Sequence, residues 1–564
     1  MIRLSTIGHI ALVAGAICSS TGCGRSTAGS SAPKVDQLFA QWNRSDSPGC
    51  GVAVSRNGAV VYEHGYGMAN LELGVRITPA SVFGAASISK QFTAMSILLL
   101  GERGQLSLDD DVSRYVPNWL DREHHITIRH LLTHTSGLRD GFALLGWAGP
   151  SDVSPNEAIT PMLARQRGVN FEPGHEYQYN NGAYNLLGRI VNVVSGQSLR
   201  EFADANIFKP LGMTSTQYRD DPAILLPNRV SGYSQDTTGF HPASEAVGVV
   251  GNAGVYTTVG DLLLWEQNLT DARVGSRTDI DSMQRPTTLI GGGTSAYGYG
   301  LAIGEYRGMR TVEHAGGDRG IATNAVRYPD RQLAVVVLCN LDTIDVTRLT
   351  HGVTDIFIAD APTSAGRGAE AVPQSEVSLS PGDLAAKPGL YRSSTSTDRV
   401  MRVSVDGKTL LARSLYGDDT DLQLSPVAAD RFRMPGTSNM LVFRAPNGTQ
   451  PQGWFVANAD GRPLASFDLV TYSPLIKDLQ SLVGDYHSPE IEVTYRLTLN
   501  GSILEVRAPG RPVIAIQPVA KDVFAGDSVG VVKVFRDARG AVLGFSLNRD
   551  NARGVRFVRV GWAG

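Results

Sequence analysis

The sequence predicts an α+β domain, an antiparallel sheet with helices over residues 36–360, followed by two small β-barrels. Three observations support this prediction. Short strand-like apolar runs mix with helical periodicity as far as about residue 360. Residues 361–382 are rich in Ala, Ser, Pro and Gly, a composition typical of a linker. The remaining residues, 383–564, alternate in strand fashion and contain an internal repeat, which favours small all-β units.

The chain begins with a stretch typical of an export signal. Arg3 supplies a positive start, an apolar stretch too short to span a bilayer follows, and small residues lead to Cys23. We therefore expect a signal peptide over residues 1–23, a flexible leader over residues 24–35, and a protein of the periplasm or cell envelope. Lipidation of Cys23, which would tether the protein to the membrane, stays open because Ser20 stands where lipoprotein signals usually carry an aliphatic residue.

Net charge and cysteine usage exclude several classes of protein. The formal net charge is −3, so the chain has no basic footprint for nucleic acid. The four cysteines form neither a Cys-x-x-Cys motif nor a cluster with histidine, and we expect no metal and no cofactor. Cys50 opens one strand-like run and Cys339 ends another; a disulfide and two buried free thiols both fit the sequence. No sequence feature indicates an oligomeric state.

Local patterns place three elements of the α+β domain. Residues 50–62 consist of two strand-like runs around an Asn-Gly turn, which predicts a β-hairpin. Residues 91–104 place apolar side chains at helical spacing and predict a largely buried helix. Residues 333–338 (LAVVVL) form a continuous apolar run, which is typical of a strand in the middle of a sheet.

The C-terminal part of the chain consists of two copies, residues 383–475 and 476–564. The segment GLYRS at residues 389–393 returns as GDYHS at residues 484–488, and two later segments return in the same order. Both copies alternate in strand fashion and lack long helical periods. We therefore predict two β-barrels or sandwiches of roughly 90 residues each.

Ser87 and Lys90 form a Ser-x-x-Lys element at the start of the predicted helix. Positions i and i+3 share one face of a helix, so the two side chains point into the same space. A serine hydroxyl needs a base to become a nucleophile, and lysine can be that base only if its pKa is lowered. We interpret Ser87 as a candidate nucleophile, although the same spacing at Ser31 and Lys34, in the leader, carries no such meaning.

Two further segments offer groups that suit the same chemistry. Tyr179 supplies a phenol that can relay a proton, and Asn181 supplies an amide that can bind a carbonyl group. His314 stands beside Gly316 and Gly317, whose backbone can approach a bound molecule closely. Each segment alone is typical of an ordinary polar turn. Taken together in this order, the three segments indicate one site.

The three motifs resemble those of the class C β-lactamase-like serine hydrolases of the penicillin-binding-protein type. That family includes D-aminopeptidases, DD-peptidases and esterases. The resemblance covers residues 36–360, and residues 128–138 (IRHLLTHTSGL) also look typical of the family. It implies that Ser87 is acylated, that Lys90 takes the proton of Ser87, and that Tyr179 passes protons to the leaving group.

The resemblance also implies a set of substrate-binding groups. Asn181 would hold the substrate amide, and His314 and Gly316 would line the substrate site. The backbone N–H groups of Ser87 and Gly317 would form an oxyanion hole.

The third motif departs from that of true β-lactamases. Those enzymes usually carry Lys-Thr-Gly, with a lysine that helps to bind the β-lactam carboxylate, whereas this chain has His314-Ala315-Gly316. The histidine form and the two trailing β-domains resemble D-aminopeptidases. The resemblance therefore favours small peptides or amides of D-amino acids as substrates. Ester hydrolysis within the same family, and an envelope protein that binds peptides without turnover, are the alternatives.

Two other patterns do not support a second site. Ser528 lies in a Gly-x-Ser-x-Gly match at residues 526–530, but no histidine follows it, as an α/β-hydrolase triad would require. His130 and His134 have the spacing of zinc ligands on a helix, but Leu131 replaces the glutamate of the zinc-protease motif. We expect these two histidines to take part in ordinary packing.

Overall fold

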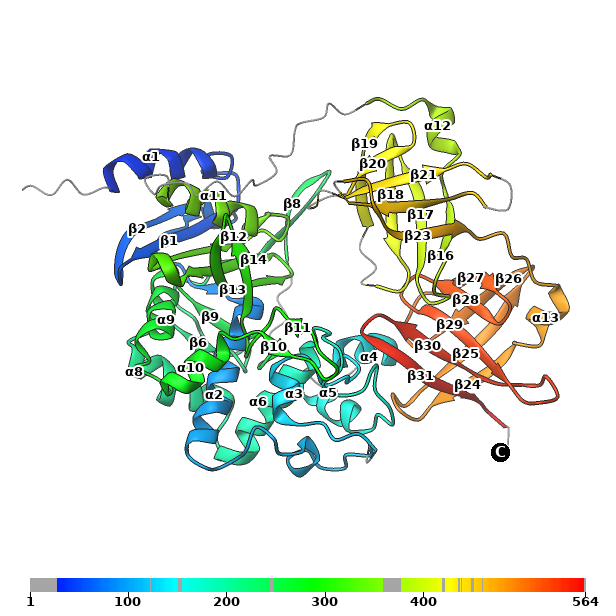
Figure 1. Cartoon of the computed structure of the whole chain (residues 1–564), viewed down its shortest axis with the longest axis horizontal. Helices are drawn as coiled ribbons and strands as arrows, with labels where there is room; N and C mark the ends of the chain where they lie inside the picture. Colours follow the sequence, from blue (N-terminus) through cyan, green and yellow to red (C-terminus); the bar gives the residue numbers. More distant parts are fainter. Residues whose placement is uncertain are drawn as a thin grey trace, which may run out of the picture.

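The structure, a computed structural model, has an α+β domain followed by two closed β-barrels, as the sequence predicts (Figure 1). It describes residues 28–121, 123–150, 155–243, 248–358, 377–417, 421–434, 437, 439–447, 451–458 and 460–561. The predicted signal peptide with Cys23, and most of the predicted linker, lie outside these residues. Across the described part of the chain, no helix is both long and apolar enough to cross a bilayer.

A six-stranded antiparallel sheet forms the centre of the α+β domain, in the order β12-β13-β14-β15-β1-β2. Its strands are β1 (Cys50–Arg56), β2 (Ala59–Tyr66), β12 (Ala302–Tyr306), β13 (Met309–Asp318), β14 (Ile321–Tyr328) and β15 (Leu333–Cys339). The predicted hairpin is the β1–β2 pair, and its turn residues Asn57 and Gly58 both have positive φ. That conformation fits the twist of a two-residue hairpin, which explains the Asn-Gly pair.

The central strand β15 is buried on both faces of the sheet. Val336 and Leu338 belong to one apolar cluster, and Val335 and Val337 belong to another on the opposite face. Helices α1 (Ala28–Phe39) and α11 (Val346–Ile358) lie on one face, and α9 (Val259–Asp271) lies on the other (Figure 1). Burial on both faces explains why this strand is apolar at every position.

Helix α1 differs from the flexible leader that we expected over residues 24–35. Val35 and Phe39 are one helical turn apart, and both side chains are completely buried in the cluster beneath α1 and α11. The polar residues around Pro33 obscured this apolar pair in the sequence. The prediction was therefore wrong from Ala28 onward, because the sheet supplies a surface that orders this segment.

The rest of the α+β domain consists mostly of helices, with several short strands. The predicted buried helix is confirmed as α2, and Phe92 and Met95 within it are completely buried. The helical elements are η1 (Ala86–Ser89), α2 (Lys90–Glu102), η2 (Val112–Arg114), α3 (Ile128–Leu132), α4 (Gly141–Ala148), α5 (Pro155–Ala164), α6 (Asn181–Ser195), α7 (Leu199–Ala203), η3 (Asp204–Phe208), α8 (Lys209–Leu211), α10 (Arg277–Met283) and η4 (Pro329–Arg331). The short strands are β3 (Met68–Asn70), β4 (Val75–Arg76), β5 (Phe83–Gly84), β6 (Gln217–Tyr218), β7 (Tyr233–Asp236), β8 (Gly239–Pro242), β9 (Val255–Thr257), β10 (Thr287–Thr288) and β11 (Thr294–Ser295).

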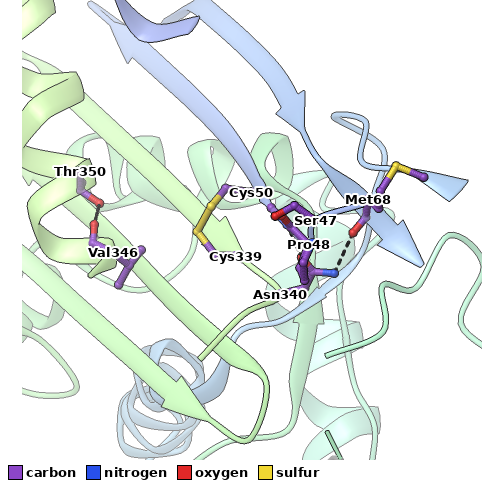
Figure 2. The surroundings of a disulfide bond; sticks show 9 residues. Ser47, Pro48, Cys50, Met68, Cys339, Asn340, Val346 and Thr350 are labelled. Carbon is purple, nitrogen blue, oxygen red and sulfur yellow. Dashed lines mark hydrogen bonds between the residues drawn. A yellow bond between two sulfur atoms is a disulfide. The ribbon is translucent and has the colours of Figure 1, made fainter. Parts of the chain in front are cut away.

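A disulfide joins Cys50 to Cys339, which resolves the alternative that the sequence left open (Figure 2). The two cysteines are direct partners in the register of β1 and β15, so the bond joins the start of β1 to the end of β15. The next residue, Asn340, donates through Nδ2 to the carbonyl of Met68 at 3.0 Å and accepts through Oδ1 from the backbone N–H of Gly49 at 2.8 Å. The bond and the amide together hold the first and last strands of the domain in register.

Two closed antiparallel barrels of eight strands each follow the α+β domain. The first has α12 (Pro381–Ala385), β16 (Gly389–Ser393), β17 (Val400–Asp406), β18 (Thr409–Ser414), β19 (Asp421–Ala428), β20 (Arg431–Arg433), β21 (Met440–Arg444), β22 (Gly453–Ala457) and β23 (Pro463–Leu469). The second has α13 (Ile476–Gln480), β24 (Gly484–Ser488), β25 (Val493–Asn500), β26 (Ile503–Arg507), β27 (Ile514–Ala520), β28 (Val523–Gly526), β29 (Gly530–Arg536), β30 (Val542–Arg549) and β31 (Ala552–Arg559).

The repeated residues have the same structural role in both barrels. Tyr391 donates its hydroxyl to the carbonyl of Lys387 at 2.7 Å, and Tyr486 donates to Leu482 at 2.8 Å. Each tyrosine therefore ties the first strand of its barrel to the residue that stands four positions before it. The second repeated segment forms a bulge in each barrel, after Pro426 and after Pro518. The sequence repeat is thus a repeat of structure.

The second barrel packs directly against the α+β domain. Strands β30 and β31 lie beside helix α4 in Figure 1. Leu144 and Trp147 of α4 share one apolar cluster with Tyr495 and Phe557 of the barrel. Tyr495 also donates its hydroxyl to the carbonyl of Trp147 at 2.6 Å. Because the apolar core is continuous across this contact, the two units bury a common surface.

The disulfide predicts a measurable loss of stability when both cysteines are replaced. A native disulfide that closes a long loop typically contributes about 2–5 kcal/mol to the free energy of unfolding. The double variant Cys50→Ala/Cys339→Ala should therefore unfold at a lower urea concentration while it keeps its secondary structure. Urea titrations with and without dithiothreitol measure the change. Reductant should lower the midpoint of the parent and leave that of the variant unchanged; equal midpoints for both proteins without reductant would contradict the bond.

Candidate active site

Ser87 and Lys90 lie where η1 runs into helix α2. Lys90 is completely buried, whereas Ser87 is partly exposed, so the serine faces the surface and the lysine lies behind it. The distance from Lys90 Nζ to Ser87 Oγ is 3.0 Å. Lys90 Nζ also donates to Asn181 Oδ1 and to the carbonyl oxygen of Asn252, both at 2.8 Å.

The surroundings of Lys90 favour a neutral amine. Burial lowers the pKa of Lys90 well below its ordinary value, and the carboxylate of Asp140 opposes this shift only in part. The oxygens of Asn181 and Asn252 can only accept, so they take two N–H groups. A neutral amine then has its lone pair left for the hydroxyl of Ser87. This is the state in which a lysine can remove a proton from serine.

Tyr179 and Asn181 reach the site from the loop that precedes helix α6. Asn180 begins this helix as its N-cap, because its Oδ1 accepts from the N–H of Ala183 at 2.9 Å. The cap places Asn181 on the first turn, with its side chain on Lys90. The ring centroid of Tyr179 lies 4.8 Å from Lys90 Nζ. The asparagine in the middle of this motif therefore serves as the cap of helix α6, a position that Ser, Thr and Asp also favour.

Tyr179 is held as a protonated phenol. Burial raises its pKa, and a hydrogen bond with Ser87 lowers it by less, so the net shift is upward. A phenol that keeps its proton at neutral pH can donate it to a leaving group. The directions of these two pKa shifts would suit Lys90 as a base and Tyr179 as a proton donor.

Asp140 is a site residue that the sequence analysis missed. Its Oδ2 accepts from the backbone N–H groups of Asn181 at 2.8 Å and Gly182 at 3.2 Å. Its Oδ1 accepts from the N–H groups of Phe142 and Ala143, so the same carboxylate caps helix α4. The sequence signal was only that of an aspartate before an apolar helix, which predicts a cap and nothing more.

His314 lies on β13 with both ring nitrogens engaged. Its Nδ1–H donates to the carbonyl of Ala315 at 2.6 Å, and its Nε2 accepts from the hydroxyl of Tyr297 at 2.9 Å. Burial is the main cause that lowers the pKa of His314 to about 3, and Lys90 lowers it further whenever its amine is protonated. The imidazole is therefore neutral at every pH at which the protein would work. Tyr297, like Asn252, lies in a segment without a recognisable motif and was missed.

Gly316 and Gly317 bring the edge of β13 against η1. A Cβ on Gly316 would lie 2.4 Å from Thr323 Oγ1 and 2.7 Å from the carbonyl of Ala85, so only glycine permits this approach. A Cβ on Gly317 would meet nothing within 4 Å, which places that residue on the open side. The pairing of β12 with β13 ends at Glu313, so the edge beside Ser87 is left to η1.

His134 packs inside the site, against the ring of Tyr179. Its Nδ1 accepts from the backbone N–H of Asn180 at 3.1 Å, and its ring centroid lies 4.3 Å from that of Tyr179. Burial lowers the pKa of His134 well below its ordinary value. Among the described residues, no group of His, Cys, Asp and Glu side chains is arranged to hold a metal ion. The other rejected candidate, Ser528, is exposed in the turn between β28 and β29.

The structure thus brings Ser87, Lys90, Tyr179 and Asn181 together, with His314 beside Tyr179. A serine paired with a buried lysine on this fold defines a serine hydrolase. The chain belongs to the beta-lactamase family, whose family model matches residues 35–352.

Similar proteins agree with this assignment. A D-aminopeptidase of Brucella anthropi is 27% identical over 91% of this chain and 95% of that protein, so the similarity includes the barrels. A D-aminopeptidase of Brucella canis is 31% identical over 52% of this chain. That match spans 57% of the length of the Brucella canis protein, and six further Brucella D-aminopeptidases match over the same share.

Solved structures support the fold. A penicillin-binding protein homologue from Pyrococcus abyssi superposes with a TM-score of 0.55 at 24% identity, covering 78% of this chain and 99% of that one. A D-amino acid amidase from Ochrobactrum anthropi superposes with a TM-score of 0.51 at 22% identity, covering 58% of this chain and 98% of that one.

The buried lysine predicts the pH dependence of the serine's reactivity. The rate at which a neutral fluorophosphonate labels the protein should rise with pH as Lys90 loses its proton, with a midpoint well below 10.5. His314→Gln should leave that midpoint in place, because a group with a pKa of about 3 does not titrate in this range. Labelling rates measured from pH 5 to about 10 test both statements. A midpoint that moves in His314→Gln would assign the ionisation to the histidine.

Proposed function

We propose that the protein hydrolyses amides or short peptides of D-amino acids through an acyl-serine intermediate on Ser87. The observation that carries the proposal is the buried Lys90 amine, with two acceptors on its N–H groups and Ser87 Oγ at 3.0 Å. The proposal keeps for Ser87, Lys90 and Tyr179 the roles that the family resemblance implies, and the distances around Lys90 support it.

The reaction would proceed in two halves. Lys90 takes the proton of Ser87 as Oγ attacks the substrate carbonyl, and the N–H groups of Ser87 and Gly317 receive the negative charge on the carbonyl oxygen. The proton passes through Tyr179 to the nitrogen of the leaving group, the C–N bond breaks, and the acyl group stays on Ser87. A water molecule then attacks the ester and loses a proton to the same base. The C–Oγ bond breaks, the proton returns to Ser87 Oγ, and the acid is released.

Asn181 would bind the substrate through its Nδ2 group alone, which is a narrower role than the resemblance implies. Its Oδ1 is occupied by Lys90, so only its Nδ2 is left to donate to a substrate carbonyl. The amide therefore has two tasks, one on the base and one on the substrate.

The neutral side chain of His314 favours substrates that place no carboxylate next to the third motif. True β-lactamases place a lysine there, whereas the imidazole in this chain carries no charge and has both nitrogens engaged. His314 therefore offers no positive charge to a substrate carboxylate at this position, which fits an amide or an ester without a free carboxylate. The similarity to D-aminopeptidases that extends through the barrels supports the amino-acid amide over the ester.

We also propose that the protein works outside the cytoplasm. Disulfides persist in oxidising compartments, and the Cys50–Cys339 bond fits such a location. The predicted signal peptide supports the same conclusion. A lipid on Cys23 would tether the protein to the membrane in that location.

Replacement of the nucleophile tests the assignment of the site. Ser87→Ala should abolish fluorophosphonate labelling and lower kcat by a factor on the order of 10⁶, because the hydroxyl forms the intermediate. Ser528→Ala is the matched control and should change neither quantity, since that serine lies in an exposed turn of the second barrel. Labelling that survives in Ser87→Ala and disappears in Ser528→Ala would reverse the assignment.

Substrate class is tested with three compounds and the unmodified protein. We expect turnover of D-alanine p-nitroanilide, slow turnover of its L-enantiomer, and some turnover of a short p-nitrophenyl ester, because esters are intrinsically more reactive. Steady-state kcat/KM values give the comparison. Equal values for the two anilides, or ester turnover with none on the D-anilide, would favour the esterase alternative. Labelling of Ser87 without turnover of any compound would favour a binding protein.

A further inference from the structure

The second barrel meets the α+β domain at a buried ion pair. The side chains of Arg139 and Glu490 are each only 7% exposed, and the guanidinium contacts the carboxylate. Arg139 also donates to the carbonyl of Arg553 at 2.7 Å and to that of Gly554 at 3.1 Å, both in the barrel. Its contact within its own domain is Gln166 Oε1, at 2.8 Å. The barrel therefore supplies most of the partners of this cation.

The residue after Arg139 continues the connection into the active site. Asp140 donates its backbone N–H to the carbonyl of Asn551 at 2.7 Å, in the turn between β30 and β31. The carboxylate of Asp140 accepts from the N–H groups of Asn181 and Gly182. A single residue thus bonds the barrel on one side and the second motif on the other.

A second connection runs from the same turn to the residue next to Tyr179. Gln178 donates through Nε2 to the carbonyl of Asp550 at 2.6 Å. Asn170 donates through Nδ2 to the carbonyl of Asn551 at 3.0 Å and to Gln178 Oε1 at 2.7 Å. The loop that carries Tyr179 is therefore held at its start by Gln178 and at its end by Asp140.

We propose that the second barrel is a positioning part of the active site, with Arg139, Glu490 and the turn at residues 550–551 holding Tyr179 and Asn181 against Lys90. A buried charge is strongly unfavourable without its partner, so the ion pair fixes the barrel in one place. The carbonyls of the turn belong to a closed barrel and cannot shift independently of it. None of these contacts reaches Ser87 or Lys90, so they act through the loop.

Two isosteric variants in one segment test the proposal. Glu490→Gln removes the charge that faces Arg139. Glu492→Gln, two residues later, removes the partner of Arg165 at the same interface, in a pair whose side chains are 64% and 27% exposed. A misplaced catalytic group costs roughly 10- to 100-fold in rate, and we expect that loss in fluorophosphonate labelling of Glu490→Gln. Glu492→Gln should stay within about twofold of the parent, because exposed ion pairs contribute little.

Hydrogen exchange gives the readout that general destabilisation would not produce. The backbone N–H groups of residues 180–182 are bonded to His134 and Asp140, so their exchange reports the position of the loop. In Glu490→Gln, exchange should rise in a peptide over residues 178–183 and stay unchanged in α2. Unchanged exchange in the loop, or an equal rise throughout the α+β domain, would overturn the proposal.

A second variant covers the case in which Glu490→Gln does not fold. Asn170→Ala removes the hydrogen bonds of this side chain with Gln178, Asn551 and Arg553, and the side chain is only partly buried, so the fold should survive. It should raise exchange in the same peptide and lower the labelling rate. Normal loop exchange and a normal labelling rate in a folded Asn170→Ala protein would overturn the proposal.

This inference rests on the proposed function only in that the labelling rates require Ser87 to be the nucleophile. If the parent protein is labelled at Ser87 but does not turn over the D-anilide, the substrate proposal fails and the labelling rates still decide the role of the barrel. If Ser87 is not labelled at all, the assignment of the nucleophile fails, and hydrogen exchange alone decides the role of the barrel.

Discussion

The burial of Lys90 is the constraint on which the rest of this structure depends. An amine without contact to water must be neutral or fully paired, and here its acceptors come from two separate segments, at Asn181 and Asn252. Each segment must be placed to within a fraction of an ångström, because a lost acceptor would leave a buried donor without a partner. The capped start of α6, which places Asn181, fits that requirement.

Parts of the α+β domain that do not touch Lys90 help to hold the site residues in place. Apolar clusters cover both faces of the sheet, and a disulfide joins its neighbouring strands β15 and β1, so the edge formed by β13 has a fixed support. The helical side needs a different device, because the loop before α6 is polar and partly exposed. There the chain uses carboxylate and amide side chains that bond to backbone groups, with Asp140 as the residue on which two helix starts converge.

Sequence reasoning found the residues whose chemistry is local and missed those whose role comes from folding. Ser87 and Lys90 are three residues apart, and Tyr179 and Asn181 stand in a short motif, so a pattern can reveal them. Asp140 has the sequence of any helix cap, and Tyr297 stands in a Gly-rich loop; only the packed structure gives either residue its place in the site. The disulfide could not be decided either, because it depends on the register of two strands that are far apart in the chain. The sequence also predicts a flexible leader around Val35, because the surface that orders this residue is formed by strands far away in the chain.

The two barrels share a repeated sequence pattern, but their surfaces differ at the position that contacts the α+β domain. Counted from the serine that ends the repeated segment in each copy, Glu490 corresponds to Thr395, which has no charge to offer an arginine. The first copy therefore could not take the place of the second against the α+β domain, although its strands follow the same order and its tyrosine makes the same bond. The repeat gives two barrels with the same strand order. The carboxylate of Glu490 makes the second barrel specific for the contact with Arg139.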